Sequence, residues 1–193
     1  MTERKVIAVF GISGVGKTTI IRRWLDGHDD ALHLQASTLI RQGLTDPAPD
    51  SEKLRRSSAQ GILTNQDILV EMFRRAVTAS RAGLVVFDGH LVIDTDELFV
   101  EIPLAVVAAL QPHTLVHIEH LPVAIAARRR ADIGRERPVR DTSTLQCHQA
   151  RSRALCQAYG SKLGVQVVLV NQEEQSALNA AVALGIRATG GSS

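Results

Sequence analysis

Short apolar runs alternate with longer stretches of helical periodicity along this chain. Several runs are rich in Val, Ile and Leu, as expected for strands that are buried on both faces of a sheet. The alternation predicts an α/β fold with a five-stranded parallel sheet and helices on both faces. The predicted strands span residues 6–10, 31–34, 84–87, 114–118 and 165–170.

Residues that favour helix ends separate these strands. The segment Thr64-Asn-Gln-Asp67 resembles a capping box and predicts a helix that begins there and ends at Gly83. Pro103 suits the first turn of another helix, and Asn171 is placed to cap the last one. Ligands of parallel sheets bind at the carboxyl ends of the strands, so we expect the site in the loops after residues 10, 34, 87 and 118.

The segment Gly11-Ile-Ser-Gly14-Val-Gly16-Lys17-Thr18 fills every required position of the phosphate-binding loop, or P-loop. It follows a predicted buried strand and precedes apolar residues at helical spacing, which argues against a glycine-rich turn that binds nothing. In such a loop, backbone N–H groups hold phosphates, Lys17 reaches the terminal phosphates and Thr18 binds Mg²⁺. The motif therefore predicts a three-layer P-loop NTPase fold with ATP and Mg²⁺ as cofactors. The residues assigned to ATP binding are Gly11, Gly14, Val15, Gly16, Lys17, Thr18 and Thr19.

Asp88 ends the predicted strand at 84–87. A lone aspartate at a strand end is more often a turn former or a helix cap, but beside a P-loop it suits a magnesium ligand together with Thr18. His90 follows closely, where it would either contact a substrate phosphate or hold the loop.

Arginines are dense after the fourth predicted strand. Such a run is usually a solvated surface, but phosphoryl transfer needs cations around the phosphate oxygens, and guanidinium groups supply them. We expect two or three of these arginines to be catalytic and the others to lie on the surface. The run comprises Arg128, Arg129, Arg130, Arg135, Arg137, Arg140, Arg151 and Arg153.

Composition limits the possible partners. The formal net charge of +2 and the few aromatic residues, four Phe, one Trp and one Tyr, argue against nucleic acid as a partner. The first apolar run ends at residue 10, too short for a signal or a membrane span, so we expect a cytoplasmic protein with no membrane partner. Cys147 and Cys156 face opposite sides of one predicted helix, so neither a disulfide between them nor a metal site is expected.

The most specific motif is Arg137-Pro-Val-Arg140-Asp141, followed by His148-Gln149, Arg153 and Tyr159-Gly160. Together with Asp88-Gly-His90, it resembles the arginine-rich lid and the strand-end motif of the archaeal-type adenylate kinase family. This family is a branch of the nucleoside monophosphate kinases within the P-loop kinases. The resemblance covers about residues 5–185.

The resemblance implies reversible transfer of the γ-phosphoryl group of ATP to a nucleoside monophosphate, with AMP as the default acceptor. Catalysis would then fall to Lys17, Arg137, Arg140 and Arg128, and Mg²⁺ binding to Thr18 and Asp88. Arg55 would grip the acceptor phosphate, and Gln66 is our candidate for reading the base. The full set assigned to substrate binding is Ser37, Thr38, Arg55, Gln66, His90 and Arg153.

We expect a single domain over residues 1–186, with an acceptor-binding insert at about 36–66, a lid at about 128–141 and a flexible tail at 187–193. The stretches 46–50 and 134–138 depart from the family pattern on the side of the site that sets specificity. The acceptor therefore stays open between AMP, another nucleotide, a deoxynucleotide, a nucleoside and a non-nucleotide alcohol.

An alternative function is an ATP-hydrolysing switch or assembly factor that acts on a protein or RNA partner. The apolar stretch 98–110 would then be an interface, although such a stretch is more often core. The phosphate-binding motif is common to both functions, and the oligomeric state is open.

Overall fold

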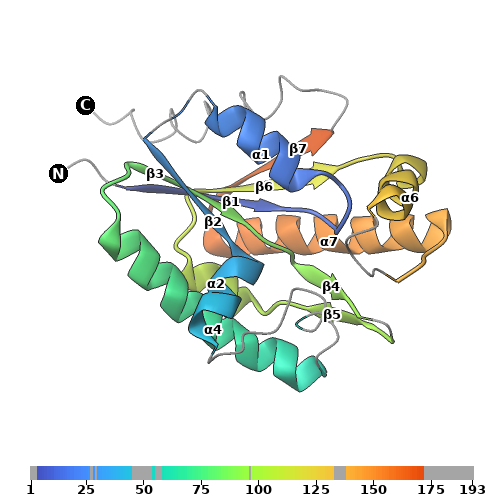
Figure 1. Cartoon of the computed structure of the whole chain (residues 1–193), viewed down its shortest axis with the longest axis horizontal. Coiled ribbons are helices and arrows are strands. Elements are labelled where there is room, and N and C mark those ends of the chain that lie inside the picture. The colour runs from blue at the N-terminus through green and yellow to red at the C-terminus, as the bar shows by residue number, and fades with distance from the viewer. Residues whose placement is uncertain are drawn as a thin grey trace.

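A five-stranded parallel sheet forms the centre of the molecule (Figure 1). The computed structural model describes residues 4–26, 28, 30–44, 54, 58–95, 97–132 and 138–171. The strand order is β2-β3-β1-β6-β7, and all neighbours are parallel, so the predicted sheet is confirmed. The strands are β1 (Lys5–Phe10), β2 (Ala31–Gln35), β3 (Leu84–Asp88), β6 (Thr114–Glu119) and β7 (Gln166–Asn171).

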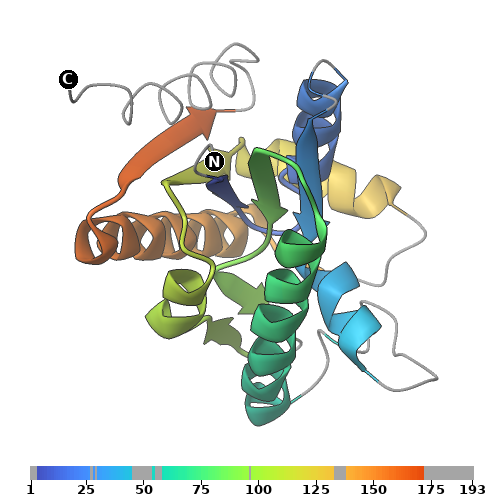
Figure 2. The ribbon, with the colours of Figure 1, turned by 90° about the vertical axis from the view of Figure 1, so that its left-hand side faces the viewer.

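Helices cover both faces of this sheet, which makes a three-layer fold. Alternate residues of β1 enter two different hydrophobic cores: Ile7 packs on the side of α1 and α6, and Phe10 packs on the side of α2, α4, α5 and α7. Figure 2 shows α5 between α4 and α7 on the second side. The helices are α1 (Lys17–Leu25), α2 (Ala36–Gly43), α4 (Ala59–Ala79), α5 (Leu104–Ala109), α6 (Pro122–Ala131) and α7 (Thr142–Leu163).

A short antiparallel hairpin, β4 (Val92–Asp94) and β5 (Phe99–Glu101), follows β3 and was not predicted from the sequence. It leads into α5, and Val100, Ile102 and Val107 are all buried there. The stretch 98–110 is therefore mainly core, and Leu98 is its exposed large apolar residue.

The long helix α4 begins earlier than predicted. Ser58 is its N-cap, and the Ser58 hydroxyl accepts a hydrogen bond from the Gly61 amide at 3.1 Å. The predicted start at Thr64 is wrong because the helical pattern continues back to Ala59, and Ser58 is an equally good cap. The helix also ends at Ala79, before Gly83.

Two further expectations concern α7 and the end of the chain. Cys147 is exposed and Cys156 is buried, and both are free, as predicted from their spacing. The helix that Asn171 was expected to cap lies outside the described residues. Within the described part of the chain, no helix has the length and apolar character needed to cross a membrane.

Candidate active site

The P-loop joins β1 to α1 at the carboxyl edge of the sheet. Gly11, Gly14 and Gly16 all have positive φ angles, of 152°, 87° and 95°. A Cβ atom on Gly11 would lie 2.6 Å from the carbonyl oxygen of Ile118, so no other residue fits there without movement of the backbone. Gly16 is the N-cap of α1, and Thr19 lies in its first turn, so the loop leads directly into the N-terminus of a helix, where phosphate groups commonly bind.

Lys17, Thr18, Asp88 and His90 meet beside this loop. The register of β1 and β3 sets Val9 opposite Asp88, which brings the end of β3 to the P-loop. The Thr18 hydroxyl donates to Asp88 Oδ2 at 2.9 Å, and Asp88 is buried. Lys17 Nζ donates to the Gly11 carbonyl at 2.9 Å and lies 3.2 Å from His90 Nε2.

This arrangement fits a magnesium–nucleotide complex. Hydroxyl and carboxylate oxygens are the ligands that Mg²⁺ prefers, and Mg²⁺ usually takes its other ligands from water and substrate phosphates. The described residues contain no cluster of three or more His, Cys, Asp or Glu side chains that would hold a metal ion. The oxygens of Thr18 and Asp88 are suited to Mg²⁺ that is also held by substrate phosphates.

Two consecutive arginines of α6 bind the carbonyl groups of the P-loop. Arg128 Nη1 donates to the Val15 carbonyl at 2.9 Å, and Arg129 Nε donates to the Ser13 carbonyl at 3.0 Å. Gly14 lies between these carbonyls, and a Cβ atom on it would come within 2.9 Å of Arg129 Cγ. The loop and the helix are therefore fitted to each other.

Asp94 connects Arg129 to Arg140, which precedes α7. The Asp94 carboxylate lies 3.4 Å from Arg129 Nη1 and 3.0 Å from Arg140 Nη2. Arg140 also donates to the Thr95 carbonyl at 2.9 Å. The next residue, Asp141, caps α7 by accepting a hydrogen bond from the Thr144 amide at 2.7 Å, which fixes the chain just after Arg140. Sequence analysis missed Asp94 because nothing marked the short hairpin that carries it.

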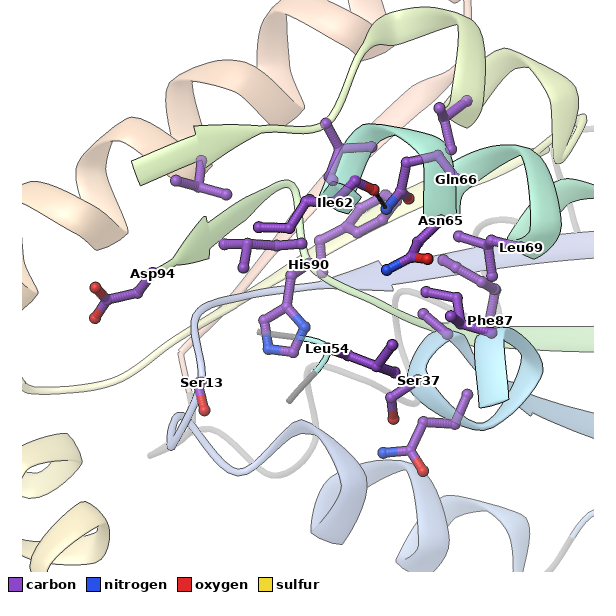
Figure 3. Close-up of a pocket in the computed structure, with 18 of the residues that line it drawn as sticks. Ser13, Ser37, Leu54, Ile62, Asn65, Gln66, Leu69, Phe87, His90 and Asp94 are labelled. Atoms are coloured by element: carbon purple, nitrogen blue, oxygen red, sulfur yellow. Dashed lines mark hydrogen bonds between the residues drawn. The ribbon is translucent and has the colours of Figure 1, made fainter. Parts of the chain in front are cut away.

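A pocket of about 180 Å³ opens next to this charged cluster (Figure 3). Ser13 and Asp94 lie toward one side, Asn65, Gln66 and Leu69 lie toward the other, and His90 lies between them. Most of its wall is apolar, from the sheet, the β4–β5 hairpin, α2, α4 and α5. Its remaining polar residues are Gln35, Ser37, Arg129 and His148.

The predicted substrate residues separate into three groups. Ser37, Gln66 and His90 line the pocket. Thr38 and Arg153 are not among the residues that line it: the Thr38 hydroxyl donates to Gln35 Oε1 at 3.3 Å, and Arg153 forms an exposed ion pair with Glu119 at 3.4 Å. Arg55 and the predicted catalytic Arg137 lie outside the described residues.

His148 and Gln149, the motif residues in α7, contact the elements that carry the site. His148 Nε2 lies 3.2 Å from the Val92 carbonyl, and its ring stacks on Phe99 at 4.4 Å, which joins α7 to the hairpin. Burial lowers the pKa of His148 to about 4, so it is neutral at pH 7. The Gln149 amide group bonds both the N–H and the C=O of His120, at 3.0 and 3.1 Å, and so fixes the entry to α6. These two residues position the elements that carry Arg128, Arg129 and Asp94.

A second buried histidine belongs to the core. His117 Nε2 lies 2.9 Å from the Ser152 hydroxyl, between β6 and α7. Burial, with Lys17 and Arg153 as smaller causes, lowers the pKa of His117 to about 3. His117 is therefore a neutral residue that packs a helix onto the sheet.

Comparisons with known proteins agree with this fold and this loop. A family model described as an AAA domain matches residues 10–146. The adenylate kinase of Pyrococcus abyssi is 26% identical over 184 residues, which cover 92% of this chain and 91% of the relative. The adenylate kinase of Thermococcus kodakarensis is 27% identical with the same coverage, and that of Methanococcus vannielii is 23% identical over 89% of this chain and 91% of the relative.

A solved structure supports the fold. The crystal structure of TT1252 from Thermus thermophilus superposes with a TM-score of 0.53 over 97% of this chain and 99% of that one, at 13% sequence identity. The P-loop NTPase fold predicted from the sequence is thus confirmed. The chain belongs to the AAA domain family whose model matches it, and this match together with the similarity to archaeal adenylate kinases supports the family at the level of the nucleoside monophosphate kinases.

Proposed function

We propose that this chain is a kinase that transfers the γ-phosphoryl group of MgATP to a nucleoside monophosphate, with AMP as the default acceptor. One observation carries the proposal: residues that line a mainly apolar pocket contact the P-loop directly, since His90 lies 3.2 Å from Lys17 Nζ and Arg129 donates to the Ser13 carbonyl. The adenylate kinase relatives support a phosphotransferase that acts on nucleotides.

The P-loop amides and Lys17 would hold and neutralise the phosphates of ATP. Thr18 and Asp88 would hold Mg²⁺, which neutralises charge on the phosphate oxygens when it is bound. Arg128 and Arg140 would stabilise the charge that develops during transfer, together with Arg137. Positioning and charge stabilisation supply most of the catalysis in phosphoryl transfer, so the reaction needs no protein nucleophile.

The pocket beyond His90 suits the acceptor. Its apolar wall and its amide side chains favour a heterocyclic base over a polyol, which would need many more hydrogen-bonding partners. Gln66 Nε2 donates to the Ile62 carbonyl at 2.8 Å, so Oε1 is the atom of this amide that we assign to a base N–H. Ser37 is a second candidate contact, whereas Arg153 would first have to leave Glu119.

The acceptor-binding insert at about 36–66 and the lid at about 128–141 remain part of this proposal. The arrangement of α2 and α4 around the pocket supports the insert, and the position of Arg140 beside the pocket residue Asp94 supports the lid. A cytoplasmic location and a possible protein partner stay predictions from the sequence.

The test is phosphoryl transfer from MgATP to a panel of nucleoside monophosphates, deoxynucleotides and nucleosides, with ATP hydrolysis in the absence of acceptor measured in parallel. ADP formation that depends on one acceptor supports the kinase and identifies the substrate. Hydrolysis at the same rate with every acceptor would contradict the proposal and favour an ATP-driven switch.

A further inference from the structure

Asp94 carries a buried negative charge in a cluster of positive ones. Its side chain is 4% exposed, that of Arg129 is 7% exposed and that of Arg140 is 25% exposed. Oδ1 faces Arg140, with contacts of 3.3 Å to Nε and 3.0 Å to Nη2, and Oδ2 faces Arg129. One carboxylate thus binds two guanidinium groups, one from α6 and one from the segment that precedes α7.

A buried guanidinium group needs an anion beside it, because an uncompensated charge in this environment is strongly destabilising. Asp94 supplies this anion for both arginines. The oxygens of a phosphate group can meet the same need, since guanidinium groups bind phosphate as well as carboxylate.

The position of the cluster makes this exchange possible. Arg129 is held on the P-loop through Ser13, so its guanidinium group lies beside the place where phosphates are expected. Asp94, Arg129 and Ser13 all line the pocket, and the Asp94 carboxylate points away from the end that contains Asn65 and Gln66 (Figure 3). Arg140 is the more exposed of the two arginines and has the greater freedom to turn from a carboxylate to a ligand.

We propose that Asp94 is an internal competitor for the phosphate groups of the nucleotide. The Asp94 carboxylate pairs with Arg140 and Arg129 until a phosphate group replaces it at Arg140. The Asp94–Arg140 pair forms again when the product leaves. The inference rests on the proposed function, since it requires a phosphate-bearing ligand at the P-loop. Asp94 weakens nucleotide binding and in return speeds release.

The test uses Asp94→Asn, which removes the charge and keeps the size of the side chain. Glu101→Gln is the matched control: Glu101 lies on β5 of the same hairpin and pairs with Arg151 at 2.6 Å, but both side chains are about half exposed, at 40% and 52%. Both variants change the net charge by the same amount, so general attraction of the nucleotide is controlled. The measurements are the dissociation constant of ADP by calorimetry, and KM and kcat in the transfer assay.

Asp94→Asn should bind ADP at least about tenfold more tightly than the wild type, which is the factor that a charge-assisted hydrogen bond contributes. Its KM and kcat should both fall, because release becomes slower. Glu101→Gln should match the wild type in all three quantities. In an Arg140→Gln background, Asp94→Asn should lose most of the gain in affinity.

Equal or weaker ADP binding by a folded Asp94→Asn variant would overturn the inference while leaving the kinase proposal intact. If the wild type itself does not bind ADP, the proposed function fails and this inference fails with it. If Asp94→Asn does not fold, a crystal structure of the wild type with ADP and Mg²⁺ decides: Arg140 should bind a phosphate and no longer Asp94, and an intact Arg140–Asp94 pair would refute the competition.

Discussion

Replacement of Gly14 by alanine tests whether the P-loop and α6 are fitted to each other as the structure indicates. At φ 87°, an alanine adopts a left-handed conformation that costs about 1–2 kcal/mol. Its Cβ atom would also lie 2.9 Å from Arg129 Cγ and 3.3 Å from Arg129 Nε. Arg129 would have to move and give up its hydrogen bond to Ser13, a charge-assisted bond worth about 1.5–3 kcal/mol. We therefore expect a total loss of about 2.5–5 kcal/mol in the free energy of unfolding.

Two other glycines separate these contributions. Gly164 has φ 67° but no atom within 4 Å of a Cβ placed on it, so Gly164→Ala should cost only the backbone term, about 1–2 kcal/mol. Gly83 has open space and no positive φ, so Gly83→Ala should change stability by less than about 0.5 kcal/mol.

The assay is urea denaturation of all three variants, with ADP binding measured by calorimetry. Gly14→Ala should also bind ADP more weakly, because the carbonyls of Ser13 and Val15 move with the loop. If Gly14→Ala is as stable as Gly164→Ala and binds ADP like the wild type, Arg129 does not hold the P-loop and the reasoning is wrong.

Two further predictions concern catalysis and pH. Lys17→Ala and Arg140→Ala should each slow phosphoryl transfer by about 10²–10³-fold, because each removes charge stabilisation, and neither should change the circular dichroism spectrum. A transfer rate in Arg140→Ala equal to that of the wild type would contradict the role of the lid. His117 and His148 remain neutral in the folded protein down to about pH 3 and about pH 4, whereas the unfolded chain protonates them near 6.5. As the pH falls from 6.5 toward 4, the unfolded state gains protons that the folded state does not. The free energy of unfolding should therefore fall by up to about 1.4 kcal/mol per pH unit for each histidine. Urea denaturation across this range checks it, and in His117→Gln the slope should be less steep.

Much of the scaffold follows from local sequence. Each of the five predicted strands was recognised as a short apolar run, and the three central strands, β1, β3 and β6, are buried on both faces as expected. The edge strands β2 and β7 are only partly buried. The P-loop was equally clear, because a tight turn into a helix requires glycines at fixed spacing. Its partner Asp88 was found by position alone, since parallel strands end at the same edge of the sheet.

Short elements were harder to predict. The β4–β5 hairpin has only three residues in each strand, too few for a periodic pattern, and it carries Asp94. The start of α4 was placed too late because Ser58 and Thr64 are both acceptable caps, and the packing of the residues between them decides which one is used.

The sequence by itself determined the sheet, the P-loop and the arginine-rich composition of the site. Only the tertiary structure decided which arginine binds which group: Arg128 and Arg129 bind the P-loop, Arg140 binds Asp94, and Arg153 remains on the surface with Glu119. The physical reason is that the backbone preferences of neighbouring residues fix strands and turns. The partner of a long charged side chain, in contrast, depends on groups that are distant in sequence and on how much water the fold leaves around them.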